Sequence, residues 1–242
     1  SMFIWTVTFA LSVVAISFLI GTILAVILHK RDVRVAKVYR LIFILPWAIP
    51  SVITLLMWQG LLDSYDGLIN NILGIFGLGP VPFLIHPIVA RLSTIFVMSW
   101  FTFPYYLTVS QGIISNIPTE YYEAMYIDGG NSFSCYSKIT VPIVIRSIFP
   151  ILILGFIMQF NQFGVYMLTG GGPAGETLGS PGATDLLITY IFNQAFNVNQ
   201  YGLAAAYSVI IFIFLGVFTL VTMHLIEGKR TKAPKKRKTR GN

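Results

Sequence analysis

The polar side chains that could contact a ligand lie within the most apolar stretches of this 242-residue chain, and they are uncharged. They are hydroxyls and amides, namely Ser51, Thr54, Thr102, Thr108, Gln159, Asn161 and Gln162. Gln159 and Gln162 are spaced i, i+3 and Gly155 lies one turn earlier, so a helix would bring the three to one face. Amides donate and accept hydrogen bonds, and they are costly in hydrocarbon unless paired. Such a lining favours a neutral, hydroxyl-rich ligand over a phosphate or a zwitterion.

Aromatic side chains accompany these polar groups. Phe101, Tyr105 and Thr108 would share a face of another helix, because their spacing follows the helical repeat. Aromatic rings can stack on the apolar faces of sugar rings, which also favours a carbohydrate. The alternative for each of these residues is that it only packs one helix against another.

The segment EYYEAMYIDGG, residues 120–130, is a charged interruption between apolar stretches. Pro118 suits the first turn of a helix, acidic residues at its start complement the dipole, and Gly129 with Gly130 would end it. A second helix would start near Ser132 and re-enter the apolar region at Pro142. Several side chains are too apolar for a solvated loop: Tyr121, Tyr122, Met125 and Ile127. The predicted helix is therefore a docking element for another protein or a helix that lies on lipid.

Membrane-spanning helices must position these segments. The chain is 55% hydrophobic and 10% charged, whereas a soluble domain has roughly 25% charged residues. Apolar windows near the ~20 residues that cross hydrocarbon recur along it. We predict an all-α integral membrane protein with a transmembrane core at 1–228 and a basic tail at 229–242. The predicted spans are 3–28, 40–61, 88–112, 143–167 and 203–226.

The basic residues predict the topology. HKRDVRVAKVYR, residues 29–40, is basic, the insert at 115–142 contains Lys138, and eight of the sixteen Lys and Arg lie in the tail. No Lys or Arg occurs between Arg40 and Arg91 or between Arg146 and Lys229. The positive-inside rule therefore places 29–39, 115–142 and the C-terminus in the cytoplasm, and 62–87 and 168–202 outside. Ser1 would then lie outside without a start region, which suggests that upstream N-terminal helices belong to the native protein.

Prolines interrupt several predicted spans. Pro46 and Pro50 lie in the second, Pro104 in the third and Pro150 in the fourth. Each proline removes a backbone donor, and in lipid the freed carbonyl must be satisfied by a neighbour or by water. Broken helices at membrane depth therefore line a cavity or a packed interface, and three of them together favour a transport pathway.

Several function classes are disfavoured. The glycine-rich GGGPAGET lacks the lysine of a phosphate-binding loop and precedes no soluble βαβ unit, so we expect no ATP hydrolysis by this chain. The spans lack the mid-membrane charges that ion-coupled carriers use. Cys135 is the single cysteine, and the three histidines have no ligand spacing, so we expect no metal site. The basic tail is typical of a topogenic flank, with anionic lipid a lesser alternative and nucleic acid a remote one.

The pattern Glu123-Ala124-x(4)-Gly129-x(9)-Ile139-x-x-Pro142 resembles the EAA loop of the membrane subunits of binding-protein-dependent ABC importers. In that family the loop forms coupling helices that sit in a cleft of a cytoplasmic ATPase. The resemblance implies ATPase-coupling residues at Glu123, Ala124, Met125, Asp128, Gly129, Ile139 and Pro142. Two positions depart from the pattern, Met125 in place of Ala and Val141 in place of Leu, and both stay apolar.

The resemblance covers nearly the whole chain. FILPWAIPS, SWFTFPYY, QFNQFGVYMLTGGGP, GATDLLITYIFNQAF and YGLAAAYSVIIF are similar to the carbohydrate branch, and most similar to the larger permease subunit of maltose/maltodextrin importers. The implied substrate-binding positions are Trp47, Phe101, Thr102, Tyr105, Gly155, Met158, Gln159 and Gln162. On the fourth span the family has Ser, Phe, Asn and Asn where this chain has Gly155, Met158, Gln159 and Gln162, which puts the identity and length of the sugar in doubt.

The resemblance implies a permease subunit of an ATP-driven sugar importer in a bacterial cell membrane, with maltose or maltodextrin as the expected cargo. Its expected partners are a second homologous permease, two copies of a cytoplasmic ATPase that uses ATP and Mg, an extracellular sugar-binding protein, an oligosaccharide and membrane lipid, with no nucleic acid. The alternatives are an importer of another oligosaccharide or of glycerol-phosphate, an ATPase-independent secondary carrier, and a non-transporting scaffold.

Overall fold

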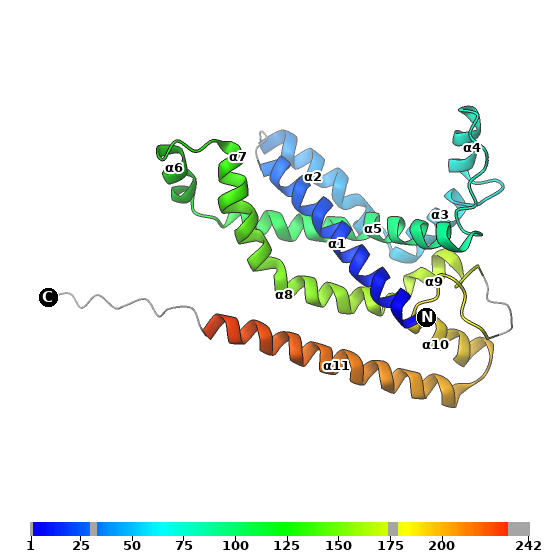
Figure 1. Ribbon diagram of the computed structural model, residues 1–242. Coiled ribbons are helices and arrows are strands. Elements are labelled where there is room, and N and C mark those ends of the chain that lie inside the picture. Colours follow the sequence, from blue (N-terminus) through cyan, green and yellow to red (C-terminus); the bar gives the residue numbers. More distant parts are fainter. Residues whose placement is uncertain (1, 30–32, 174–178, 232–242) are drawn as a thin grey trace.

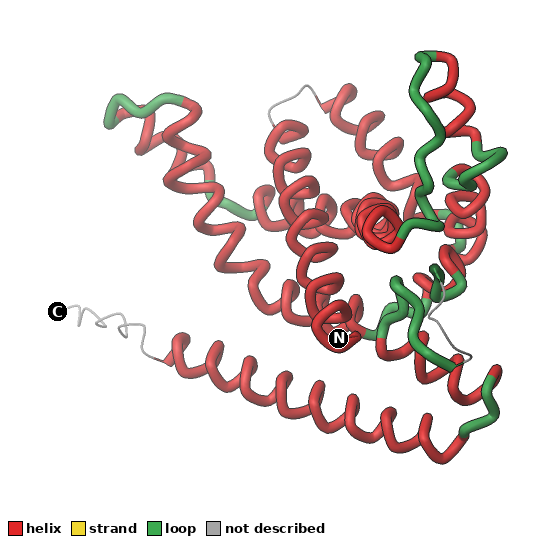
Figure 2. The backbone as a smooth tube through the Cα atoms, turned by 45° about the vertical axis from the view of Figure 1, so that its right-hand side comes forward, coloured by secondary structure: helices red, strands yellow, loops and turns green. Residues whose placement is uncertain are grey.

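The computed structural model describes residues 2–29, 33–173 and 179–231, and within these ranges the regular elements are helices (Figures 1 and 2). They are α1 (Met2–His29), α2 (Val33–Ala48), α3 (Ser51–Leu61), α4 (Leu68–Ile75), α5 (Pro87–Ser115), α6 (Thr119–Ile127), α7 (Ser132–Cys135), the π-helical turn η1 (Tyr136–Thr140), α8 (Val141–Phe160), α9 (Gly164–Thr169), α10 (Leu187–Phe192), the π-helical turn η2 (Asn193–Asn197) and α11 (Tyr201–Thr231). The predicted all-α class is confirmed. Ser1, Glu176, part of the basic loop at 30–32 and the tail from residue 232 lie outside the described residues.

Among the described residues, four helical segments are long and apolar enough to cross a membrane: Met2–His29, Pro87–Ser115, Ser132–Phe160 and Tyr201–His224. Val35–Ala48 and Ser51–Leu61 form a further candidate as a pair bent by 90°. Pro50 stands at this bend as the residue before α3. The other prolines, Pro46, Pro104 and Pro150, lie inside continuous helices.

The helix in the fourth predicted span has other bounds than the predicted 143–167. It begins at Ser132, inside the predicted cytoplasmic insert, and continues through η1 into α8. It ends at Phe160, because Asn161 leaves the helical conformation with φ −100° and ψ 26°. The residues that follow form a turn and the short helix α9.

The centre of the fold is the crossing of α1 and α5, which lie side by side in both views (Figures 1 and 2). Gly21 permits the close approach, since a Cβ there would lie 2.6 Å from the Leu107 backbone nitrogen. Ser17 Oγ donates to the Ser99 carbonyl at 3.2 Å, and Thr22 Oγ1 lies 3.0 Å from Ser110 Oγ. Small residues and interhelical hydroxyls are the usual means of packing helices in a membrane, where no hydrophobic effect draws them together.

Other helices pack around this pair. One buried cluster joins α1, α3, α5 and α9 through Phe9, Leu55, Val97 and Leu168. The long α11 lies along the side of the bundle, where Phe214 and Phe218 contact Phe160 and Phe156. Most of the other large apolar side chains on α11 are exposed, as are those on the outer faces of α1 and α2.

Polar contacts fold the connection between α9 and α10. The Asp185 carboxylate is 3% exposed and accepts hydrogen bonds from the Gly182 N–H and the Thr189 hydroxyl, both at 2.8 Å. Burial raises the pKa of this carboxyl, and its effect exceeds that of the two hydrogen bonds, which lower it. Nearby, Arg91 Nε donates to the Ala183 carbonyl at 2.7 Å, and its guanidinium lies 4.9 Å from the centre of the Trp5 ring. This connection is therefore tied to both α1 and α5.

Candidate functional site

The predicted polar site is centred on one hydrogen bond between the third and fourth span helices. Gln159 Nε2 on α8 donates to Thr102 Oγ1 on α5 at 3.1 Å. The Gln159 side chain is 5% exposed, and its Oε1 atom is buried without a hydrogen-bond partner in the described part of the chain. A buried carbonyl oxygen without a donor is costly. The pair therefore holds a spare acceptor that a ligand hydroxyl could satisfy once α5 and α8 move apart.

Aromatic rings lie close to this pair. Trp47, in the last turn of α2 before the bend at Pro50, lies 6.0 Å from Tyr105 between ring centroids. Tyr105 in turn lies 5.3 Å from Tyr106. Phe101, Thr102 and Tyr105 are half-buried on α5, and Trp47 is exposed. The structure thus brings together a neutral polar pair and an aromatic pair from α2, α5 and α8.

The expectation that Gln159 and Gln162 share a helical face is wrong. The helix α8 ends at Phe160, so Gln162 lies in the turn beyond it and its Oε1 accepts from the Gly164 N–H at 3.1 Å. An amide that can bond a nearby backbone group competes with helix continuation. The structure therefore gives Gln162 a local role in starting α9.

Two further predicted residues lie on α8 with Gln159. Gly155 is buried, and a Cβ there would overlap the Tyr106 hydroxyl, so this glycine allows α5 and α8 to approach each other. Met158 is 70% exposed on α8. Substrate contact by either residue stays a prediction.

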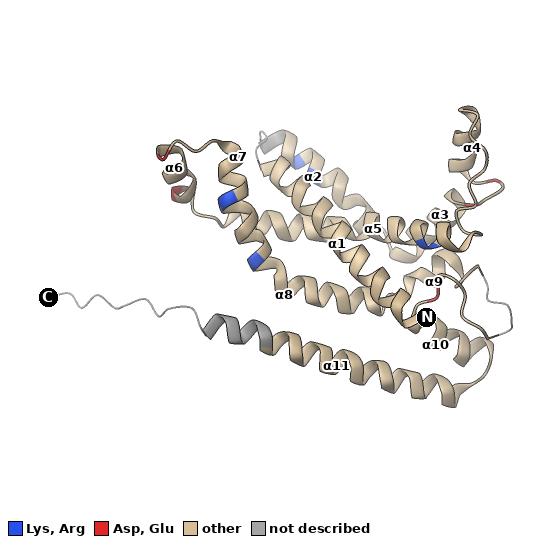
Figure 3. Ribbon diagram, viewed as in Figure 1, with Lys and Arg blue, Asp and Glu red and all other residues tan. Residues whose placement is uncertain are grey.

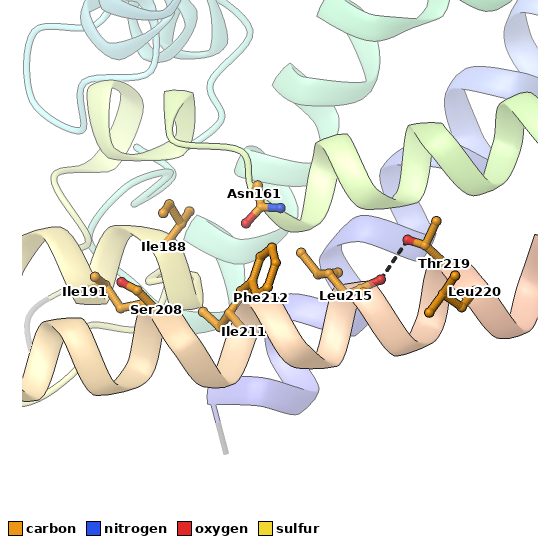
Figure 4. Close-up of a pocket in the computed structure, with 10 residues that line it drawn as sticks. Asn161, Ile188, Ile191, Ser208, Ile211, Phe212, Leu215, Thr219 and Leu220 are labelled. Carbon is orange, nitrogen blue, oxygen red and sulfur yellow. Dashed lines mark hydrogen bonds between the residues drawn. The ribbon is translucent and has the colours of Figure 1, made fainter.

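A cavity in the described part of the chain lies elsewhere. A groove of about 550 Å³ lies between the end of α8, α10 and α11 (Figure 4). Its lining is mostly apolar, and none of the predicted substrate-binding residues contributes to it: Asn161, Ile188, Ile191, Ser208, Ile211, Phe212, Leu215, Gly216, Thr219 and Leu220. A groove of this character suits an apolar chain or a helix better than a sugar.

The insert between the third and fourth spans forms a capped helix at one end of the bundle. Pro118 is the residue before α6, so the helix begins one position later than predicted. Gly129, with φ +79°, ends it, and the Gly130 N–H bonds the Met125 carbonyl at 2.8 Å while the Gly129 N–H bonds the Tyr126 carbonyl at 3.1 Å. This pair of bonds is the Schellman motif that the two glycines predicted.

The α6 helix has no fully buried side chain, and its acidic residues Glu120, Glu123 and Asp128 are exposed (Figure 3). The nearby helix that follows carries Lys138 and Arg146, also exposed. Tyr121, Tyr126 and Ile127 are exposed as well. The helix thus offers a mixed acidic and apolar surface, which suits contact with another protein.

One side-chain hydrogen bond connects α6 to the start of the fourth span helix. The Tyr122 hydroxyl lies 2.9 Å from Thr140 Oγ1, and Thr140 is fully buried at the junction of η1 and α8. Sequence reasoning missed this contact, because the partners are 18 positions apart and Tyr122 stood out only by its apolar character. Thr140 is one residue after the motif position Ile139, which was the closest available signal.

Comparison with known proteins places the chain in a family. The profile described as "Binding-protein-dependent transport system inner membrane component" matches residues 17–232. The galactooligosaccharides transport system permease protein GanP of Bacillus subtilis (strain 168) is 36% identical over 231 residues, covering 95% of this chain and 54% of GanP. The maltose/maltodextrin transport system permease protein MalF of Escherichia coli (strain K12) is 36% identical over 231 residues, covering 92% and 44%.

The chain thus spans about half the length of these curated relatives. Among solved structures, a chain of a bacterial alginate ABC transporter, in complex with alginate pentasaccharide-bound periplasmic protein, matches with a TM-score of 0.76. It is 22% identical, and the match covers 97% of this chain and 80% of that one. The match to the solved structure shows a shared fold.

Proposed function

Because the chain belongs to the family of binding-protein-dependent transport system inner membrane components, we propose that it is a permease subunit of an ATP-driven carbohydrate importer. The observation that carries the proposal is α6, an exposed, Schellman-capped helix between two candidate spans, within the matched region. A transport subunit without its own nucleotide site needs such a surface to receive work from an ATPase.

The proposed cargo is a neutral oligosaccharide. The Thr102–Gln159 pair offers hydroxyl and amide groups without charge, and Trp47 with Tyr105 offers rings on which a sugar can stack. Asp, Glu, Lys and Arg are absent from the sequence between Arg91 and Glu120 and between Arg146 and Glu176, so an anionic cargo such as glycerol-phosphate would lack a counter-charge there. Maltodextrin and galactooligosaccharides both fit this chemistry, and relatives named for each are 36% identical.

In the proposed transport cycle, the described conformation is the one in which the Thr102–Gln159 pair is closed to the sugar. In the described conformation Gln159 Oε1 is buried, and α5 and α8 touch at Gly155 and Tyr106. ATP-driven closure of the ATPases would displace α6, and the Tyr122–Thr140 hydrogen bond would carry that displacement to α8. Separation of α5 and α8 would then expose Gln159 to the sugar. Each nucleotide state favours the conformation with which it makes better contacts.

The proposed assembly contains a second homologous permease, two cytoplasmic ATPase copies that use ATP and Mg, and an extracellular sugar-binding protein. The α6 helix and the C-terminus would face the cytoplasm of a bacterial cell, while α4 and the connection from α9 to α10 would face outward. The exposed apolar sides of α2 and α11 are available to the second permease or to lipid.

Uptake measurements test the cargo site. Cells that express the complete transporter would be given labelled maltotriose and, separately, a labelled galactooligosaccharide. We expect Gln159→Leu combined with Tyr105→Ala to abolish uptake of the transported sugar, with the protein still present in the membrane. Leu154→Met, at an exposed position on the same helix and outside the predicted site, is the matched control.

Unchanged uptake in the double variant would contradict the proposed pocket while leaving the family intact. Uptake that persists after ATP is depleted would favour an ATPase-independent carrier instead. The labelled sugar that the unsubstituted transporter takes up, maltotriose or the galactooligosaccharide, decides between the two cargo candidates.

A further inference from the structure

The short helix α4 presents an exposed apolar stripe outside the main bundle. Leu68, Ile72, Ile75 and Phe76 follow an i, i+4, i+7, i+8 pattern, so they share one side of the helix. Ile75 is 81% exposed and Phe76 is 75% exposed. Large apolar side chains gathered on one side of a helix mark a surface that binds another protein or a membrane.

The stripe is held in place by a buried asparagine on the other side of α4. Asn70 is 6% exposed, and its Nδ2 donates to the carbonyls of Ser64 and Val81 at 3.2 and 3.0 Å, while its Oδ1 accepts from the Val81 N–H at 2.9 Å. These bonds join the segment before α4 to the segment after it. The segments on both sides of α4 are therefore held together, and this holds α4 in the orientation that exposes its apolar stripe.

The position of α4 points to the membrane surface. It lies at the opposite end of the bundle from α6, between the ends of α3 and α5, and it runs across the direction of α5 and α11 (Figures 1 and 2). Since α5 and α11 hold candidate spans, a helix that crosses their direction runs along the membrane plane. The half-buried Ile69, on another side of α4, packs against the core cluster that contains Leu62.

The charge pattern favours lipid over a soluble protein as the occupant. The sequence from Gly67 to Ala90 contains no Asp, Glu, Lys or Arg, although it includes the whole of α4 and the start of α5. Rims of protein interfaces are polar and solvent-accessible, whereas an apolar face next to a span continues the lipid-facing surface. Helices of this kind insert their apolar side at the boundary of headgroups and acyl chains.

We propose that α4 is an interfacial helix whose side formed by Leu68, Ile72, Ile75 and Phe76 is inserted in the bilayer leaflet at the end of the bundle opposite α6. It would fix the end of α3 relative to the membrane plane. The inference goes beyond the proposed transport function, because it depends on neither the cargo nor an ATPase.

Site-directed spin labelling of the complete transporter in proteoliposomes tests the inference. Single cysteines replace Ile72, Ile75 and Phe76 in turn, and collision rates with oxygen, which concentrates in lipid, are compared with those of a water-soluble nickel chelate. Leu19→Cys, at a 56% exposed position on α1, is the lipid reference, and Asp66→Cys, in the exposed turn before α4, is the water reference.

We expect the ratio of oxygen to nickel collisions at Ile72, Ile75 and Phe76 to shift from the Asp66 value towards the Leu19 value. A ratio like that at Asp66 would overturn the inference, because the stripe would then face water. Low rates for both reagents would also overturn it, because a protein partner would then cover the stripe. Neither result would bear on sugar uptake.

Discussion

At the scale of single residues, the account depends on polar side chains whose partners are far away in sequence. The candidate site residues were predicted from their types and from family resemblance. Gln159 bonds Thr102 and Trp47 lies against Tyr105, while their contact with a sugar stays a prediction. Gln162 could not be placed correctly, because helical spacing was extended past Phe160, where the amide bonds the backbone instead. The Tyr122–Thr140 contact was invisible to periodicity, since periodicity describes one helix at a time.

Tyr122→Phe tests whether that contact transmits motion. The variant keeps the ring but leaves the buried Thr140 hydroxyl without this partner, which costs about 1 kcal/mol. We expect sugar uptake per ATP hydrolysed to fall several-fold while ATP hydrolysis persists. Tyr121→Phe, at an exposed position, and Thr140→Ser, which retains a hydroxyl, should both keep the ratio of the unsubstituted transporter.

Equal transport per ATP in Tyr122→Phe and Tyr121→Phe would refute this role. A fall in the melting temperature without a change in the ratio would mean that the hydrogen bond only stabilises the fold.

Asp185 gives a pH prediction. Burial raises the pKa of its carboxyl above the ordinary 3.8, so the folded state retains a proton that the unfolded state releases. Its contribution to stability is therefore fully present below pH 3.8 and is lost as the pH rises through the folded-state pKa. We expect Asp185→Asn, which cannot ionise, to flatten this part of the stability profile, measured as melting temperature against pH in detergent.

Asp63→Asn serves as the comparison for Asp185. Its exposed carboxylate accepts backbone hydrogen bonds from Asp66 and Tyr65, which lower its pKa, so its contribution is lost as the pH falls. An Asp185→Asn profile that runs parallel to the unsubstituted protein would contradict the assignment.

At the scale of elements, composition and apolar length were sufficient to predict helices, because lipid leaves the backbone few other ways to satisfy its hydrogen bonds. The two glycines that end α6 were also predictable, since their conformational role is local. The 90° bend between α2 and α3, and the π-helical turn that leads into α8, depend on packing with other helices. The sequence could mark Pro50 as an interruption of the helix, but it could not predict the angle between α2 and α3.

Gly21 tests the packing at the centre of the bundle. Gly21→Ala would put a Cβ 2.6 Å from the Leu107 backbone nitrogen, so α1 must move away from α5. We expect a loss of stability of about 1–3 kcal/mol, visible as a lower melting temperature and reduced uptake. Gly112→Ala, on α5 itself, is the matched control, because no atom lies within 4 Å of its added Cβ.

The two alanine variants should therefore differ in sign or size. If Gly112→Ala lowered the melting temperature as much as Gly21→Ala, the effect would come from replacing any glycine. The claim that Gly21 permits the close packing of α1 on α5 would then be contradicted.

At the scale of the whole molecule, two exposed surfaces agree with the proposed assembly. The α11 helix lies along the side of the bundle with most of its large apolar side chains exposed, and α6 extends from one end with exposed acidic and apolar residues. The family is one of inner membrane components, so the apolar surface of α11 is expected to face lipid or another membrane helix, and α6 is available to the proposed ATPase. The identity of the proposed sugar could not be predicted, because the residues that differ from the resembled pattern are those of the candidate site.

The most direct test of the account is cross-linking from the coupling helix in a working transporter. Glu123→Cys on α6 is compared with Tyr65→Cys, an 81% exposed position at the opposite end of the bundle, and the buried Cys135 is the sole native thiol. We predict that Glu123→Cys captures an ATP-binding subunit, and that Tyr65→Cys does not. Capture from neither position in a transporter that still imports sugar would contradict the claim that α6 receives the power for transport.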